Sequence, residues 1–227
     1  MSRTALIAGA TGLVGGHCLR ALLESSDFAR LIVLTRRPLS LLMQNATSDA
    51  VSKVEQRTVD FDRFTPCDCA GAEVVFCALG TTMAKAASKE AFRRVDYGYV
   101  KTLAEASLAV GARQFVLVSS TGANPASVNF YARVKGDAED AVAKLPFQAV
   151  HILRPSLLLG ERTESRPLEA MGRAVMPLFN PLLLGSARKY RAIKAETVGR
   201  AMVSIATRTG RGVQIYYYDQ IRGLAGL

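Results

Sequence analysis

The chain of 227 residues has no tryptophan, two histidines and four cysteines, and these shortages exclude several kinds of site. His17 and His151 are too few to supply a zinc site built on imidazole. Cys67 and Cys69 are separated by one residue, whereas zinc knuckles and redox pairs usually have two between their cysteines. We therefore expect no metal site and no disulfide framework, and we place the protein in a reducing cytoplasm.

Long apolar runs are also missing, since charged residues or glycine interrupt every stretch before it reaches the ~18 residues of a membrane span. The N-terminal segment 1–16 has no clean small-residue cleavage site, so we expect it to belong to the fold and not to a signal peptide. With 49% hydrophobic and 21% charged residues, the chain has enough apolar surface for a globular core. We expect no membrane span and one folded domain over residues 1–227.

The net charge is +10, and the basic excess lies mainly in the C-terminal third of the chain. The basic residues there include Arg188, Lys189, Arg191, Lys194, Arg208 and Arg211. Such a patch attracts phosphate non-specifically, but aromatic residues are not interleaved with it and no nucleic-acid-binding motif is present. We expect a solvated basic face near an anionic cofactor or substrate, and no specific nucleic-acid partner.

Short apolar runs alternate with helical patterns along the first two thirds of the chain. The sequence predicts strands at 4–8, 31–34, 54–59, 74–79, 115–118 and 149–153, with helices after the first strand and at 89–110, 131–144 and 196–206. Strands that are apolar on both faces and alternate with helices indicate a buried parallel sheet. The predicted fold class is α/β, a Rossmann doubly wound parallel sheet with helices on both faces.

The alternation of strands and helices ends after residue 155, where prolines become frequent. Pro167, Pro177 and Pro181 interrupt short helical pieces, so about 157–195 is predicted to form a small C-terminal substrate-binding lid. Apolar walls for its pocket are expected from Met171, Met176, Leu178, Phe179 and residues 182–184, although such residues equally make an ordinary core. Tyr216 to Tyr218 are predicted to form a last edge strand.

Three glycines, Gly9, Gly12 and Gly15, follow the first predicted strand at intervals of three. A residue without Cβ allows a sharp turn and lets the backbone approach a diphosphate at the helix N-terminus, where free N–H groups favour anions. Glycines that merely pack a helix on a strand are the alternative. The strand before them and the helix after them favour a dinucleotide-binding turn.

The residues at the end of the second strand are expected to discriminate between NAD and NADP. NAD-binding proteins have a carboxylate there that binds the ribose 2′-hydroxyl. This sequence has Arg36 and Arg37 there. Guanidinium groups suit a 2′-phosphate because they form paired charge-assisted hydrogen bonds with it. We therefore predict NADP(H) over NAD(H), the alternative being two arginines that are only solvated.

A tyrosine and a lysine four residues apart share a helix face, where the ammonium favours a phenolate. This spacing occurs three times, at Tyr97/Lys101, Tyr131/Lys135 and Tyr190/Lys194, so spacing alone selects none of them. A reductase needs the pair on the helix that follows a strand ending in a hydroxyl residue. Only Tyr131/Lys135 satisfies this condition, because it follows Ser120 at the end of the fifth strand, with the adjacent Ser119 as the rival.

Eight segments spread along the chain resemble the atypical short-chain dehydrogenase/reductases, and within them the Tat-interacting oxidoreductase-like group. They are GATGLVGG at 9–16, LTRRP at 34–38, FCALGTT at 76–82, KEAFRRVD at 89–96, FVLVSSTGANP at 115–125, FYARVKGDAE at 130–139, ILRPSLLLGER at 152–162 and YRAI at 190–193. The resemblance implies cofactor contacts from Gly9, Thr11, Gly12, Leu13, Val14, Gly15, Arg36, Arg37, Asp60, Leu79, Gly80, Ser119, Tyr131, Lys135, Pro155 and Ser156. Related extended enzymes often carry Asn where this chain has Asp96.

The resemblance also implies which part of the cofactor each of these residues contacts. Asp60 would contact the adenine, whereas Leu79 and Gly80 would contact the adenosine ribose. Pro155 and Ser156 would flank the nicotinamide.

Two functions follow from these residues. The first is an NADP(H)-dependent oxidoreductase of the short-chain type that acts on a carbonyl or alcohol, with Ser120, Tyr131 and Lys135 as catalytic residues. The second is a regulatory protein that binds NADPH and senses redox state without turnover. The Tyr, Lys and Ser set favours the enzyme, since a sensor has no chemical need for it. The oligomeric state is left open, with a homodimer as one alternative.

Overall fold

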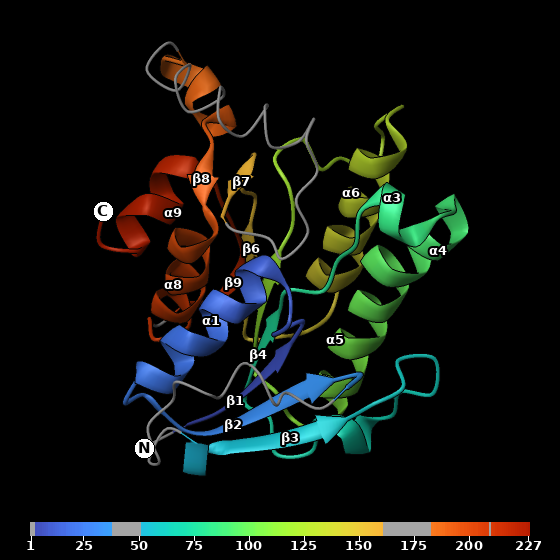
Figure 1. Cartoon of the computed structure of the whole chain (residues 1–227), viewed down its shortest axis with the longest axis vertical. Helices are drawn as coiled ribbons and strands as arrows, with labels where there is room; N and C mark the ends of the chain where they lie inside the picture. The colour runs from blue at the N-terminus through green and yellow to red at the C-terminus, as the bar shows by residue number, and fades with distance from the viewer. Residues whose placement is uncertain (1–2, 38–50, 161–182, 209) are drawn as a thin grey trace.

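The computed structural model describes residues 3–37, 51–160, 183–208 and 210–227. Seven strands form one parallel sheet in the order β3-β2-β1-β4-β5-β6-β9, as Figure 1 shows. The strand order runs outward from β1 in both directions, which is the doubly wound Rossmann arrangement. The predicted α/β fold class is confirmed.

Each predicted strand is present in the sheet. The bounds are β1 (Arg3–Ala8), β2 (Phe28–Thr35), β3 (Val54–Thr58), β4 (Val74–Cys77), β5 (Gln114–Val118), β6 (Ala149–Leu153) and β9 (Gly212–Tyr216). Side chains alternate between two cores, since Ile7 faces one side of the sheet while Leu6 and Ala8 face the other. The central strands are therefore apolar on both faces, as a parallel sheet covered by helices requires.

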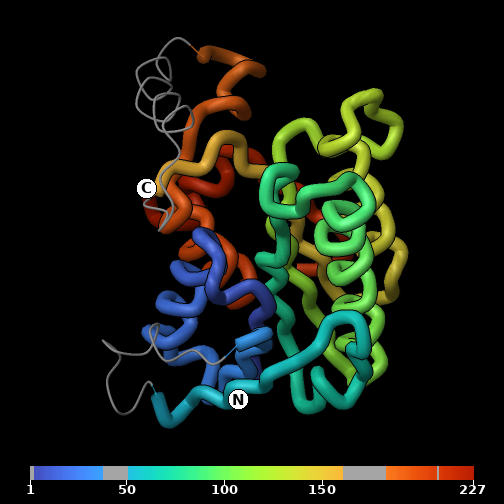
Figure 2. Tube along the Cα trace, turned by 45° about the vertical axis from the view of Figure 1, so that its right-hand side comes forward, coloured from blue at the N-terminus to red at the C-terminus, as the bar shows by residue number. Residues whose placement is uncertain are grey.

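Helices cover the two faces of the sheet in separate groups (Figure 1). One group is α1 (Leu13–Glu24), α8 (Ala195–Ala206) and α9 (Tyr218–Leu224). The other is α3 (Met83–Ala86), α4 (Lys89–Arg93), α5 (Val100–Ala109) and α6 (Phe130–Ala143). An N-terminal and a C-terminal helix come together in the first group, because α1 and α8 lie side by side (Figure 2). Their backbones approach so closely that a Cβ on Gly199 would lie 2.7 Å from the Cys18 nitrogen.

A short separate sheet marks the two ends of the predicted lid. It pairs β7 (Leu158–Leu159) with β8 (Ile193–Lys194), and a single 3-10 turn, η4 (Gly185–Tyr190), precedes β8. The predicted wall residues Met171, Met176, Leu178, Phe179 and Leu182 lie outside the described residues, so the lid over 157–195 and its place in one 1–227 domain stay predictions.

Two predicted elements differ from the structure. The edge strand at Tyr216 to Tyr218 is wrong in its second half, because β9 ends at Tyr216 and α9 begins at Tyr218. The Tyr217 N–H donates to Gln220 Oε1 (3.0 Å), which caps the new helix. The predicted helix 89–110 contains a π-helical turn, η2 (Arg94–Tyr99), between α4 and α5.

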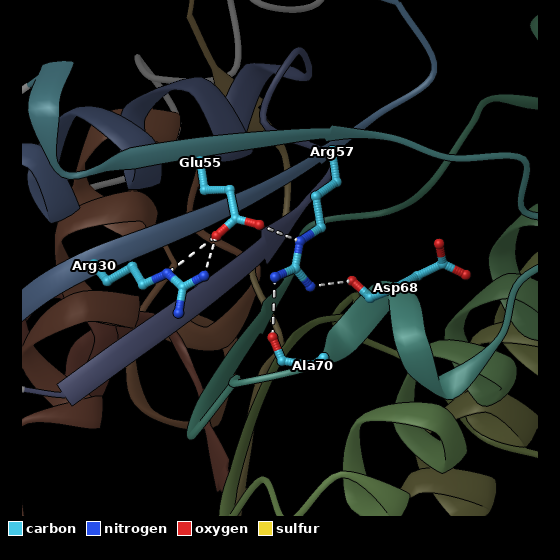
Figure 3. A network of polar contacts seen from close by, with 5 residues as sticks. All are labelled: Arg30, Glu55, Arg57, Asp68 and Ala70. Carbon is cyan, nitrogen blue, oxygen red and sulfur yellow. Dashed lines mark hydrogen bonds and ion pairs between the residues drawn. The ribbon is translucent and has the colours of Figure 1, made fainter.

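A polar network ties the loop after β3 to the sheet (Figure 3). Glu55 on β3 accepts from Arg30 on β2 (3.0 Å) and from Arg57 (2.7 Å). Arg57 in turn donates to the carbonyl oxygens of Asp68 (2.9 Å) and Ala70 (3.0 Å) at the end of the 3-10 turn η1 (Pro66–Cys69). These bonds hold both ends of the segment between β3 and η1, where the candidate adenine contact lies. In the described part of the chain, no helix is both long and apolar enough to cross a membrane.

Candidate functional site

The glycine turn between β1 and α1 needs glycine for steric reasons. Gly9 has φ +89°, and a Cβ there would lie 2.5 Å from the Ala78 carbonyl oxygen. A Cβ on Gly15 would lie 2.0 Å from the Gly9 carbonyl oxygen, while Gly12 N donates to that same oxygen (2.9 Å). Backbone segments therefore lie in direct contact within the turn and with the end of β4. The first N–H groups of α1 have no side-chain caps. Such an N-terminus fits a diphosphate group.

A cavity of about 690 Å³ opens from this turn along the carboxyl ends of β1, β4 and β5. It is lined by Thr11, Gly12, Leu13, Val14, Gly16, His17, Arg20, Ala78, Leu79, Gly80, Thr81, Thr82, Met83, Lys85, Asp96, Val118, Ser119, Tyr131, Lys135 and Leu158. The carboxyl edge of a doubly wound sheet is where this fold binds nucleotides. The cavity thus joins the diphosphate turn to the candidate catalytic residues.

Among the three Tyr/Lys pairs, only Tyr131 and Lys135 line the cavity. Both lie on α6, where Tyr131 is 39% exposed and Lys135 is buried. The Tyr131 ring packs against Phe92, with 5.6 Å between ring centroids. The other pairs lie elsewhere: Lys101 pairs with Glu105 on α5, and the Tyr190 and Lys194 pair lies on η4 and β8.

Helix α6 packs closely on the loop that follows β5, because a glycine on the helix contacts the backbone of that loop. A Cβ on Gly136 would lie 2.4 Å from the carbonyl carbon of Asn124 and 2.3 Å from the nitrogen of Pro125. The side chain of Asn129 caps the start of α6 by accepting from Ala132 N (3.0 Å). Cap and contact together set where Tyr131 enters the cavity.

The two adjacent serines after β5 differ in position. Ser119 lines the cavity, is buried, and its Oγ has no hydrogen-bond partner within the described residues. Ser120 is not among the lining residues, and its Oγ bonds weakly to the Thr121 carbonyl oxygen (3.4 Å). Neighbouring residues at a strand end point to opposite sides, so a shift of one residue exchanges them. Ser119, and not Ser120, therefore lines the same cavity as Tyr131 and Lys135.

The adenosine end of the predicted site lies at the ends of β2 and β3. Arg36 and Arg37 are exposed directly after β2. Asp60 is exposed after β3, and its Oδ1 accepts from Asp62 N (3.0 Å). None of these three predicted contacts is among the residues that line the cavity.

Aromatic rings form a stack beside Asp60 that the sequence reasoning did not single out. Phe61 stacks on Phe64 (5.2 Å between centroids) and on Tyr99 (5.3 Å), and Tyr99 Oη donates to Asp62 (2.8 Å). Burial first, and then this hydrogen bond, raise the pKa of Tyr99. The stack places three aromatic rings next to the predicted adenine contact. A signal for it was present in the run Phe61, Asp62 and Phe64 directly after a strand.

The predicted nicotinamide contacts, Pro155 and Ser156, are not among the residues that line the cavity. Pro155 is buried and accepts from Thr121 N (2.9 Å) through its carbonyl oxygen, and the Ser156 hydroxyl donates to the carbonyl oxygen of Arg191. Leu158, two residues further on, lines the cavity instead. This segment joins the ends of β5 and β6 to η4, so it shapes the cavity from outside.

The remaining titratable candidates are structural. His151 is buried on β6, its Nδ1 lies 3.1 Å from Tyr216 Oη, and burial lowers its pKa to about 4. Burial raises the pKa of the Cys77 thiol to about 12, so this buried thiol is not a nucleophile at neutral pH. Within the described ranges, no three His, Cys, Asp or Glu side chains lie close enough together to hold a metal ion.

Comparisons with known proteins give the family of the chain and a shared fold. A protein-family model described as NAD(P)H-binding matches residues 9–178. Protein HTATIP2 from Rattus norvegicus is 36% identical, over 93% of this chain and 84% of that protein. Protein FMP52, mitochondrial, from Lodderomyces elongisporus is 35% identical, over 93% of this chain and 90% of that protein. The solved structure of UDP-glucuronic acid 4-epimerase from Bacillus cereus in complex with NAD has a TM-score of 0.67 at 17% identity, covering 94% of this chain and 77% of that one, which shows a shared fold.

Proposed function

Because the chain belongs to the NAD(P)H-binding family of atypical short-chain dehydrogenase/reductases related to HTATIP2 and FMP52, we propose that it is an NADP(H)-dependent oxidoreductase. Its substrate is a small carbonyl or alcohol compound. The observation that carries this proposal is one cavity that contains both the diphosphate turn and the side chains of Ser119, Tyr131 and Lys135. A protein that only bound the nucleotide would need the turn alone.

Each of the three side chains has a place in the reaction. The bound nicotinamide would supply or accept the hydride. Tyr131 exchanges a proton with the substrate oxygen, and the Lys135 ammonium on the same helix face favours its phenolate form. The Ser119 hydroxyl has no partner in the described structure and can donate to that oxygen as charge develops, a role worth roughly 3 kcal/mol.

Replacing Tyr131 by Phe tests the enzyme proposal. The variant should lose about 10²- to 10⁴-fold in turnover, because the proton donor is removed while the ring remains packed on Phe92. The assay is NADPH absorbance with a panel of aldehydes, ketones and quinones, alongside NADPH binding measured by fluorescence. Tyr190→Phe is the matched control, since Tyr190 belongs to a pair outside the cavity. Equal turnover in wild type and Tyr131→Phe would remove Tyr131 from the mechanism.

Ser119→Ala and Ser120→Ala, compared side by side, decide between the adjacent serines. We expect the larger loss of turnover from Ser119→Ala, because only Ser119 lines the cavity. Ser120→Ala should keep most of the activity. The reverse order would return the catalytic role to Ser120.

The preference for NADP(H) is part of the same proposal and rests on the exposed guanidinium groups of Arg36 and Arg37 after β2. Replacing both by Ala should weaken NADPH binding at least tenfold and leave NADH binding nearly unchanged. Arg113→Ala is the control, because Arg113 is an exposed arginine directly before β5 that was assigned no cofactor contact. Equal losses for the two nucleotides would show that the arginines do not read the 2′-phosphate.

A regulatory protein that binds NADPH without turnover is the second candidate. The diphosphate turn supports it as well as it supports the enzyme. A substrate panel that gives no NADPH oxidation, together with tight NADPH binding, would favour the sensor.

The compartment also belongs to the proposal. We place the protein in the cytoplasm because all four cysteines are free thiols. The FMP52 relatives carry the word mitochondrial in their names, so cell fractionation with an antibody is the direct test. Recovery of the protein with mitochondria would overturn the cytoplasmic placement. Whether the protein forms a homodimer is testable by light scattering of the purified chain.

A further inference from the structure

A π-helical turn interrupts the helix between α4 and α5, at residues Arg94–Tyr99. Such turns insert an extra residue into a helix and occur often at functional sites. Asp96 lies within this turn, lines the cavity and is fully buried, with 0% of its surface exposed. A buried carboxylate is costly unless it is paired and hydrogen-bonded. The contacts of Asp96 therefore explain its position.

Both carboxylate oxygens of Asp96 contact the candidate active site. Oδ1 lies 2.7 Å from Lys135 Nζ, and Oδ2 accepts from the Thr81 N–H at 2.8 Å. The pair lies close to Gly80, where a Cβ would be 3.3 Å from Oδ1 and 3.5 Å from Lys135 Nζ. Asp96 thus joins three segments: the π turn, the loop after β4 and helix α6.

The charge of Lys135 depends on this contact. Burial is the largest single influence on the pKa of Lys135 and lowers it, but the acidic neighbours of Lys135, with Asp96 first among them, together raise it, so the pKa is raised overall. The other titratable groups that act on Lys135 are Tyr131 on its own helix and Cys77 on β4. Both of these are neutral in their protonated forms. Asp96 is therefore the one fixed negative charge among the groups that act on this ammonium within the described structure.

We propose that Asp96 is a positioning residue that keeps the buried Lys135 charged and holds its Nζ at the cavity wall. This inference rests on the oxidoreductase proposal for its purpose, because a charged Lys135 is what favours the Tyr131 phenolate. An Asn at position 96 has nearly the same shape and could still accept the Thr81 hydrogen bond. It would leave the ammonium buried without a counter-charge, which burial alone disfavours.

The test measures the protonation of Lys135 directly. Lysine side chains are labelled with ¹³C at Cε, the Lys135 signal is assigned from its absence in Lys135→Met, and the signal is titrated through the lysine range. In wild type the Lys135 pKa should be at or above the ordinary value of about 10.4. In Asp96→Asn it should fall by about 1 to 3 units, as expected for a buried lysine without a partner.

Asp137→Asn is the matched control. Asp137 lies on α6, two residues from Lys135, and pairs with Arg93 Nη1 at 2.6 Å. Its replacement removes a carboxylate of the same helix without touching Lys135, so the Lys135 titration should not move. A folded Asp96→Asn protein with an unchanged Lys135 pKa would overturn the proposal. If Asp96→Asn does not fold, the wild-type titration decides, because a Lys135 pKa below the ordinary value contradicts the proposed role.

This measurement is independent of turnover. If Tyr131→Phe has unchanged activity, the oxidoreductase proposal fails. The Lys135 titration can still show that the Lys135 pKa depends on Asp96. If the protein is an enzyme, Asp96→Asn should also move the basic limb of its pH–rate profile downward together with the Lys135 pKa. An effect on stability alone would not shift that limb.

Discussion

Replacing Gly15 by Ala should damage both stability and nucleotide binding, while the same change at Gly16 should not lower the stability. A Cβ on Gly15 would lie 2.0 Å from the Gly9 carbonyl oxygen and 2.7 Å from the Gly9 carbonyl carbon. This is roughly 1.5 Å inside the usual contact distance of about 3.5 Å. The atoms that would have to move are backbone atoms of the turn, so no side-chain rotation can relieve the clash.

The magnitude follows from that displacement. Forcing extra atoms into a packed site costs about 1 to 3 kcal/mol, which corresponds to a fall in Tm of about 2 to 12 °C for a chain of this size. A shift of the first turn of α1 would also misplace the N–H groups that we propose bind the cofactor diphosphate. We expect NADPH binding to weaken at least tenfold, equivalent to about 1.4 kcal/mol.

Gly16 provides the control on the same helix. A Cβ there would lie 3.4 Å from the Ala10 carbonyl oxygen, at the edge of ordinary contact. Gly16→Ala should be neutral or stabilising by up to about 1 kcal/mol, because alanine favours helix more than glycine does. Thermal melting and a fluorescence titration with NADPH measure both effects. Equal Tm and equal NADPH affinity in the two variants would refute the argument that the turn is built on backbone contact at Gly15.

Two further predictions concern stability. Burial lowers the pKa of His151 to about 4, below the ordinary ~6.5, so its contribution is fully present above about pH 6.5 and is lost as the pH falls toward 4. His151→Phe should reduce this loss by about 2 kcal/mol in urea unfolding at pH 5 against pH 7, and an unchanged pH slope would contradict the assignment. Glu139→Gln should cost about 3 to 5 kcal/mol, because it leaves the guanidinium of Arg154 (Nε to Oε1, 3.0 Å) without its buried partner. Asp219→Asn, which breaks an exposed pair with Arg188, should cost at most about 1 kcal/mol, and similar losses in both variants would refute the difference in burial.

The sheet was predictable from the sequence because its strands are apolar on both faces. Runs such as Leu31–Leu34 and Phe115–Val118 contain no polar residues, so they cannot be mistaken for an amphipathic surface helix. Each is a buried strand in the structure. The glycine turn was predictable for a similar reason, since Gly15 tolerates no side chain. Patterns set by burial and steric exclusion can be read from the residues alone.

Features that depend on register or on distant partners could not be predicted in this way. The π turn containing Asp96 inserts its extra residue inside a continuous helical pattern, so the apolar periodicity does not reveal it. Ser119 and Ser120 differ only in which side of the strand end they occupy. Tyr217 has strong strand propensity, yet Gln220 caps its N–H and Arg154 donates to its hydroxyl (2.8 Å), so a helix begins there.

The pairing of β7 with β8 has a consequence for how this protein could diversify. Because Leu158 and Ile193 are partners in one small sheet, the intervening chain leaves and rejoins the framework at neighbouring points. Its length can change at little entropic cost, since each doubling of a closed loop adds only about 0.6 kcal/mol. A segment of different length or sequence could therefore replace the predicted lid between these two strands while the seven-stranded sheet stays intact.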